Sequence, residues 1–126
     1  MRKTFSTHTP SELHVGYSRA VSVNNILYIS GTTSQDERGT VIGSTLGEQT
    51  RFIFTKLQKV LEQAGFTLND VTLLTVFVTD MKHLPEFDRV FKEFFGKSKP
   101  ACTLVGVNML VNPQFLVEIE GIAHKD

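Results

Sequence analysis

The stretch VTLLTVFVT, residues 71–79, is rich in β-branched side chains and is apolar at nearly every position. This pattern is typical of a strand in the middle of a sheet, and we expect both faces of the strand to be covered. The segments on either side of this strand have a different, helical period. The order of elements around it therefore determines the fold class.

Two helices are predicted, one before and one after the central strand. The first begins at Thr45, whose hydroxyl has capping-box spacing to Glu48, and ends at Gly65. The second begins near Pro85, which suits a first helical turn, and ends at Gly96. Apolar side chains recur at helical spacing at Ile53, Leu57, Val60, Leu61 and Ala64 in the first helix, and at Phe87, Val90, Phe91, Phe94 and Phe95 in the second.

Further strands are predicted towards both ends of the chain. Residues 17–23 and 26–32 read as two strands joined by a tight turn. Residues 102–110 and 115–123 read as two more, and residues 3–7 are a candidate first strand. Two helices with five or six strands indicate an α+β fold, a two-layer sandwich with a mixed sheet and both helices on one face.

The length of the chain predicts a single domain over residues 1–126, because it suffices for one hydrophobic core but not for two. With two helices on one face of the sheet, nothing in the chain remains to cover the other face. That second face nevertheless carries Leu, Val, Ile and Tyr positions. An apolar sheet face without cover predicts self-association.

Composition and charge weigh against several classes of function. Thirteen basic and thirteen acidic residues balance, which disfavours a nucleic-acid partner held by overall phosphate attraction. One cysteine excludes an internal disulfide and a zinc site of paired cysteines, and no dinucleotide or phosphate-binding motif is present, so we expect no metal and no cofactor. A polar N-terminus and the lack of a long apolar run predict a cytoplasmic protein with no membrane partner.

Several motifs in order resemble the Rid family, the reactive intermediate/imine deaminases or endoribonuclease L-PSP-like proteins. The segments are GYSRAV, LYISGT, TVFVTD, PACTLVGV and LVEIEGIA, which extend over nearly the whole chain. The resemblance implies a homotrimer whose three sheets pack into a central barrel, with a small-molecule cleft at each subunit interface. In the deaminase branch it also implies a cleft arginine that binds the carboxylate of a 2-imino acid, and a glutamate that positions water. Hydrolysis then yields a 2-oxo acid and ammonia.

The resemblance also implies roles for individual residues. It places the pocket tyrosine at Tyr17, the serine of the strand that contains LYISGT at Ser30, and the glutamate that positions water at Glu118. A polar residue of the second helix falls on Asp88. The family's substrate-binding arginine falls on Cys102, which is a departure from the family pattern.

A thiol at Cys102 cannot make the paired, charge-assisted hydrogen bonds that a guanidinium makes to a carboxylate, so the usual substrate is in doubt. Arg19 is a candidate replacement anchor, and the alternative is a surface arginine. Glu120 shares the face of Glu118 and is interpreted as a solvated side chain. Cys102 is interpreted as a small pocket-lining residue, not a nucleophile, because no base or helix N-terminus lies near it in the sequence. Its pairing with His124 stays open.

Three functions from different classes follow. The first is an enzyme that hydrolyses an imine, an enamine or a related metabolite with water positioned by Glu118 and an anchor unlike that of the family. The second is a non-catalytic protein that binds a small metabolite or regulates through it. The third is a ribonuclease or translation inhibitor, which the neutral charge and the lack of a basic, aromatic-interleaved stretch disfavour. We favour the enzyme.

Overall fold

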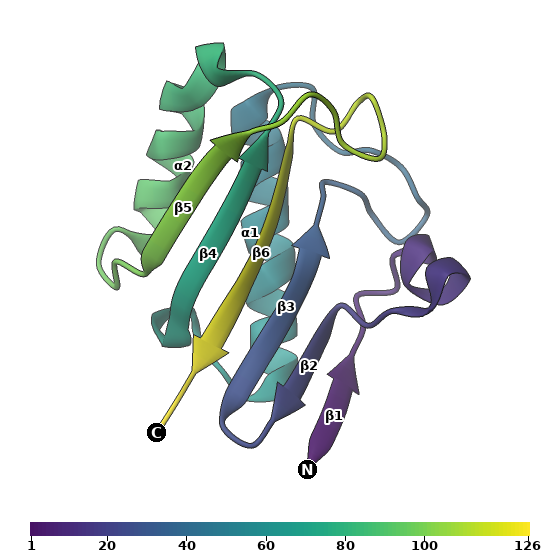
Figure 1. Ribbon diagram of the computed structural model, residues 1–126, viewed down its shortest axis with the longest axis vertical. Coiled ribbons are helices and arrows are strands. Elements are labelled where there is room, and N and C mark those ends of the chain that lie inside the picture. Colours follow the sequence, from purple (N-terminus) through teal and green to yellow (C-terminus); the bar gives the residue numbers. More distant parts are fainter.

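The apolar run at residues 71–79 forms strand β4 (Val71–Val78) of the computed structural model, which describes residues 1–126. Six strands make one mixed sheet in the order β1-β2-β3-β6-β4-β5, in which only the β4–β5 pair is parallel (Figure 1). The other strands are β1 (Arg2–Phe5), β2 (Ala20–Val23), β3 (Ile26–Thr32), β5 (Ala101–Gly106) and β6 (Val117–His124). The predicted α+β class is confirmed, including the candidate first strand.

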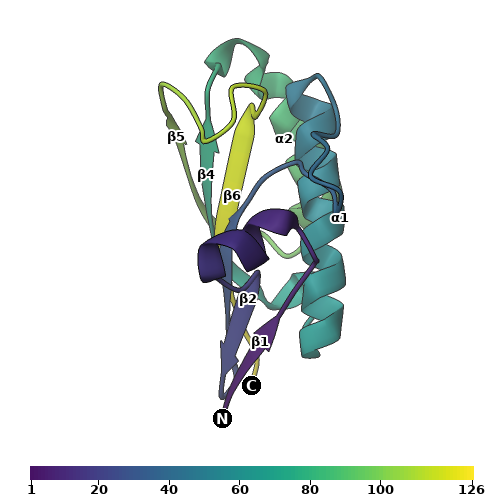
Figure 2. The same cartoon turned by 90° about the vertical axis from the view of Figure 1, so that its right-hand side faces the viewer.

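Both long helices cover the same face of this sheet (Figure 2). Helix α1 (Leu46–Ala64) begins with the predicted capping box, in which Thr45 accepts from the Glu48 amide and the Glu48 carboxylate accepts from the Thr45 amide. It ends where Gly65 adopts a φ of 82°. Helix α2 (Leu84–Phe95) follows a short helical turn, η3 (Met81–His83), and another, η2 (Leu68–Asp70), precedes β4. No helix is long and apolar enough to cross a membrane.

The hydrophobic core lies between the two layers, and aromatic rings join the helices there. The Phe54 ring of α1 packs edge-on against Phe95 of α2, with ring centroids 5.0 Å apart. The neighbouring rings of Phe87, Phe91 and Phe94 lie 5.3–6.4 Å from Phe54. The phenylalanine stripe of the second helix is therefore core, and such pairs add stabilisation beyond the burial of their area.

The face of the sheet opposite the helices, called the open face below, is only partly buried within one chain. Along β4, Leu74, Val76 and Val78 are fully or almost fully buried beneath the helices, whereas Phe77 on the open face is only partly buried. The expectation that both faces of this strand are covered is therefore not met within the single chain. Tyr28 is 46% exposed on the same face, because no element of the chain packs there.

Three strands have an end that differs by two or more residues from the prediction and that affects the site or the sheet edge. The strand expected over 17–23 begins only at Ala20, because the preceding residues close a π-helical turn, η1 (Glu12–Gly16), that the sequence pattern did not reveal. Strand β5 stops at Gly106, which pairs with the last residue of β4. Strand β6 starts at Val117, later than the predicted boundary at 115.

Candidate functional site

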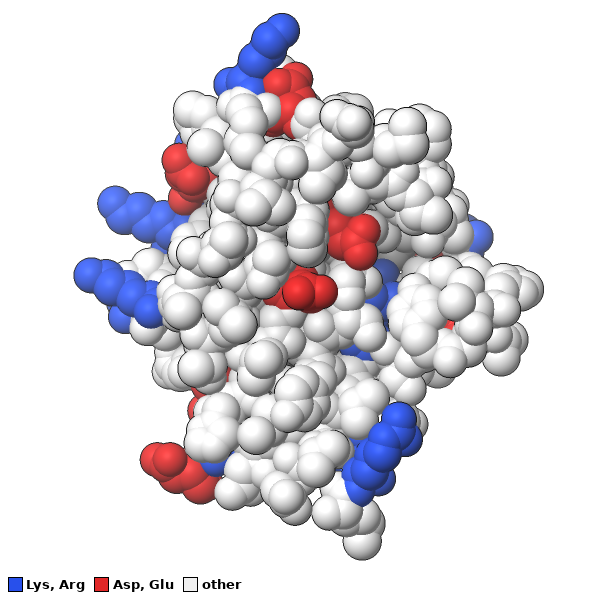
Figure 3. Space-filling view, viewed as in Figure 1, with Lys and Arg blue, Asp and Glu red and all other residues white.

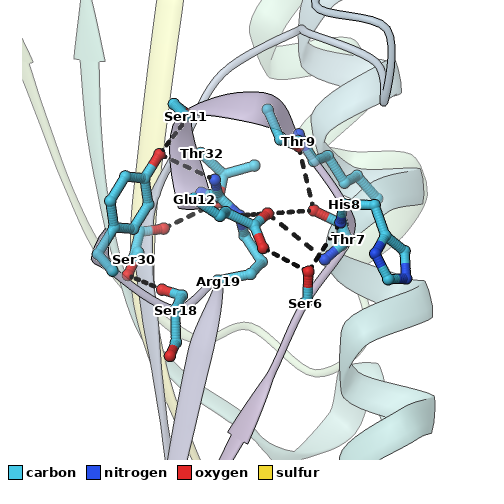
Figure 4. A network of polar contacts seen from close by, with 12 residues as sticks. Ser6, Thr7, His8, Thr9, Ser11, Glu12, Ser18, Arg19, Ser30 and Thr32 are labelled. Carbon is cyan, nitrogen blue, oxygen red and sulfur yellow. Dashed lines mark hydrogen bonds and ion pairs between the residues drawn. The ribbon is translucent and has the colours of Figure 1, made fainter. Parts of the chain in front are cut away.

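Arg19 lies at the centre of a polar network between η1 and the neighbouring ends of β2 and β3 (Figure 4). Its Nε donates to Glu12 Oε2 at 3.2 Å, and its Nη1 donates to the Gly31 carbonyl at 2.7 Å and to Thr32 Oγ1 at 3.0 Å. Only 2% of the residue is exposed. The alternative of a surface arginine is therefore excluded.

The remaining nitrogen of this guanidinium binds the candidate pocket tyrosine. Arg19 Nη2 donates to Tyr17 Oη at 3.2 Å, and the guanidinium carbon lies 5.4 Å from the centre of the ring. The Tyr17 hydroxyl also shares a hydrogen bond of 2.6 Å with Ser11 Oγ. A guanidinium has five N–H donors, so the protein itself uses four of them and leaves one on Nη2.

Glu12 supplies the counter-charge for Arg19 from η1. Burial raises the pKa of the Glu12 carboxyl, but hydrogen bonds from Ser6 and Thr7 and the Arg19 charge outweigh it and hold the pKa below its usual value. The Ser6 hydroxyl donates at 2.7 Å and the Thr7 hydroxyl at 2.8 Å (Figure 4). The pair is therefore charged at neutral pH and fully hydrogen-bonded on the carboxylate side.

Strand β3 is irregular where Arg19 meets it. Its pairing with β6 shifts between Ile29 and Thr32, and the carbonyl of Gly31 turns towards Arg19 instead of continuing the ladder. Ser30 is held at the same place, because its hydroxyl donates to the Ser18 carbonyl at 2.7 Å and its amide to the Arg19 carbonyl at 2.9 Å.

The irregular strand gives the Glu118 side chain its position. A Cβ added to Gly31 would overlap with Glu118 Oε2, so the glycine leaves room for the carboxylate above the β3 backbone and a larger residue would displace it. Burial raises the pKa of Glu118, the Arg19 charge opposes this, and Glu120 adds to it. No hydrogen bond contributes to the shift. The site therefore holds a partly buried carboxyl, without an internal partner, whose pKa is raised towards the range useful for proton transfer.

The surface around this carboxyl is mostly uncharged. Figure 3 shows the open face with acidic side chains near its centre and a hollow beside the lobe that η1 forms, with basic atoms at the base of the hollow. Tyr17, Arg19, Ser30 and Glu118, which come from three segments of the chain, meet at this end of the open face. No group of three or more His, Cys, Asp or Glu side chains is arranged to hold a metal ion.

Cys102 does not join this group within one chain. It pairs with Leu74, so its side chain points to the helix side of the sheet, whereas Glu118 pairs with Phe77 on the open face. The thiol is on an exposed edge strand, but the protein atoms around it partly desolvate it and raise its pKa, which lowers the fraction of thiolate. His124 pairs with Ile26 of β3. Its own strand, β6, is separated from β5 by β4, so His124 is not a neighbour of Cys102.

Asp88 is also separate from the network, since it is exposed on α2 in the helix layer. Two buried charges near Arg19 were not anticipated from the sequence. No sequence pattern marks Glu12 as a buried charge, because the π-helical turn brings it to its partner. The burial of Lys56 could have been predicted, because Lys56 lies three residues after Ile53 and therefore on the apolar face of its helix.

Comparisons with known proteins identify relatives in sequence and in fold. A family model described as Endoribonuclease L-PSP matches residues 8–125. A RutC family protein of Pyrococcus horikoshii is 38% identical over 111 residues, which are 87% of each chain. A solved member of the YjgF/YER057c/UK114 family from Mycobacterium tuberculosis is 35% identical, with a TM-score of 0.90 over 99% of this chain and 100% of that one. RidA from an Antarctic Psychrobacter is 32% identical, with a TM-score of 0.80 over 86% and 88% of the two chains.

Proposed function

We propose, because the chain belongs to the endoribonuclease L-PSP family (the YjgF, RutC or Rid proteins), that it hydrolyses a small imine or enamine in a cleft containing Glu118. Membership of this family supports a small-molecule-binding protein with the Rid fold. The observation that carries the proposal further is the Glu118 carboxyl, which is partly buried, has a raised pKa and lacks an internal hydrogen bond. Such a group is available to exchange a proton with a bound water.

The reaction needs two proton relays and no redox partner. In the first, water adds to the carbon of the C=N bond while Glu118 takes a proton from the water and passes it to nitrogen, which gives a carbinolamine. In the second, Glu118 takes the proton of the carbinolamine hydroxyl and passes it to nitrogen, so that the C–N bond breaks and a carbonyl compound and ammonia leave. The raised pKa of Glu118 suits both relays, because near pH 7 the carboxylate is then a stronger base and a larger fraction of the group is protonated and able to donate.

The cleft belongs in a homotrimer, with the open faces of three sheets turned towards one another. The open face supports this arrangement, because Tyr28 and Val105 are 46% and 39% exposed there and no element of the chain covers them. In such an assembly the edge strand β5 of one subunit can complete the cleft of the next. Sedimentation at micromolar concentration is expected to give three times the chain mass of 14.1 kDa, and a monomer or dimer would contradict the trimer.

Cys102 sets the expected substrate range. With no guanidinium at this position, a substrate carboxylate loses a paired charged contact, which costs on the order of 2–5 kcal/mol. Arg19 does not replace it freely, because four of its five donors are engaged inside the protein. We therefore propose an imine or enamine that is bulkier than a simple 2-imino acid or depends less on a carboxylate.

The test compares two imines generated in situ, a 2-imino acid from an amino-acid oxidase and a carboxylate-free imine from an amine oxidase. The natural chain is expected to accelerate hydrolysis of the carboxylate-free imine more than that of the 2-imino acid. The variant Cys102→Arg is expected to gain at least about tenfold in kcat/KM on the 2-imino acid alone. No acceleration of either imine by the natural chain contradicts hydrolysis.

A second candidate is a non-catalytic metabolite-binding protein on the same scaffold. The specific observation in its favour is that neither Cys102 nor Arg19 offers a free charged pair of donors for a carboxylate. Thermal-shift stabilisation by a metabolite without turnover is the result that this candidate predicts. A ribonuclease is not proposed, because the net charge is zero and the open face around the site is mostly uncharged (Figure 3).

A further inference from the structure

Lys56 is a buried cation that the proposed reaction does not use. It lies in the middle of α1 on the face that packs against the sheet, and only 7% of the residue is exposed. Its ammonium group has three donors, and it makes one hydrogen bond, to the Gln35 carbonyl at 2.9 Å. A lysine buried to this degree normally has more partners, so its Nζ retains unused capacity.

Lys56 lines a pocket on the helix side of the molecule. The pocket has a volume of about 330 Å³ and is bounded by α1, the segment around Ser6 and Thr7, and the loop that contains Gln35. Five of the eleven residues in its wall carry hydroxyl or amide groups, including Gln63 of α1, and charges of both signs are present. It is separate from Glu118, which lies on the open face of the sheet.

The electrostatic surroundings raise the fraction of neutral amine at this position. Burial lowers the pKa of Lys56 to about 8, the Arg19 charge adds to the effect, and Glu12 and Asp36 oppose it. At pH 7.5 about a quarter of such a group is the free amine, compared with roughly one part in a thousand for an ordinary lysine. Lys59, one turn further along α1, lines the same pocket but is exposed, so it provides an internal comparison.

We propose that the Lys56 amine forms a reversible imine with a small, polar, uncharged aldehyde that binds in this pocket. The nitrogen lone pair attacks the carbonyl carbon, and the carbinolamine loses water to leave a C=N bond to Nζ. No electrons are transferred, and the released water balances the step. The polar wall suits a hydroxyl-bearing aldehyde, and the mixed charges around it give no preference for an anion. This site is independent of the proposed hydrolysis at Glu118.

The experiment treats the folded, full chain with glycolaldehyde and cyanoborohydride at pH 7.5, which converts each imine into a stable secondary amine. Peptide mapping by mass spectrometry then gives the labelling rate of every lysine. Exposure alone predicts that Lys59 reacts faster than Lys56. The proposal predicts the reverse, with Lys56 at least about tenfold faster, a rate that saturates with aldehyde concentration, and a pH midpoint near 8.

Labelling that follows exposure, or a Lys56 rate that rises linearly with aldehyde without saturation, overturns the proposal. Because the mapping is done on the natural chain, no outcome depends on whether a variant folds. Two variants sharpen the result. Gln63→Ala is expected to raise the half-saturating concentration, because it removes a polar side chain from the wall, while Arg51→Met, on the exposed surface of the same helix and outside this pocket, is expected to leave Lys56 labelling unchanged.

Discussion

Two regions of the sheet are candidates for anchoring a ligand, and they are built differently. At one end, Arg19 is buried, paired with Glu12 and hydrogen-bonded to the irregular part of β3 below Glu118. At the opposite edge, Cys102 is exposed on β5 and has no charged partner. The difference indicates that the first region is a preorganised site, whereas the second is an edge that a neighbouring subunit can use.

The largest expected effect is on stability, from removing the buried charge. Arg19→Met leaves Glu12 buried without its partner, and we expect the free energy of unfolding to fall by about 3–5 kcal/mol in urea denaturation. The matched control is Arg51→Met, which breaks the exposed pair with Glu93 on the helix surface and is expected to cost less than about 1 kcal/mol. Equal losses in the two variants would show that the buried network is not the stronger one.

The second expected effect is on activity, from displacing Glu118 without changing it. In Gly31→Ala the new methyl group occupies the place of the carboxylate, so we expect kcat/KM for imine hydrolysis to fall about 10–100-fold. The control at the other edge is Gly106→Ala, whose methyl group meets the flexible end of Met81 at 3.1 Å and makes an ordinary contact with the Val78 carbonyl at 3.9 Å. The account fails here if the two substitutions reduce activity alike.

The third effect is the pH dependence of stability. Glu12 has a lowered pKa in the folded protein, so its contribution is present above its unfolded pKa near 4.5 and is lost as the pH falls through the lower folded value. We therefore expect the free energy of unfolding to decrease in acid below about pH 4.5 and this decrease to be smaller in Glu12→Gln. An unchanged acid slope in that variant would assign the effect to other carboxyls.

The smallest effect is expected at the exposed edge. Cys102→Ala removes a side chain with no hydrogen-bond or charged partner, so stability is expected to change by less than about 0.5 kcal/mol and activity to persist. Thiol labelling as a function of pH is expected to give a pKa above the usual value for cysteine. A depressed thiol pKa together with an inactive alanine variant would instead make Cys102 a nucleophile.

The parts of the fold set by local chemistry were predictable from the sequence. The capping pair Thr45 and Glu48 and the stop at Gly65 place the first helix within one residue. Strand lengths were not predictable in the same way, because a strand ends where its partner ends, as β5 does at Gly106. Residues 17–19 have strand-like composition, but the turn before them and the irregular β3 decide their conformation.

The candidate site was predictable only in part. The resemblance assigned Tyr17, Ser30 and Glu118, and the structure brings these residues to one end of the open face with Arg19. Arg19 joins η1 to β3 through its hydrogen bonds to Glu12 and the Gly31 carbonyl. The distance between Arg19 and Glu12 in the sequence does not predict that they pair. The separation of Cys102 from Glu118 follows from the strand register, which the sequence does not reveal.

The most direct test of the central claim is the kcat of Glu118→Gln for hydrolysis of the carboxylate-free imine. The amide keeps the size of the side chain but cannot take a proton from water, so kcat is expected to fall about 10²–10⁴-fold while KM changes little. A Glu118→Gln variant that hydrolyses the imine as fast as the natural chain would contradict the claim that this carboxyl is the proton-transfer group.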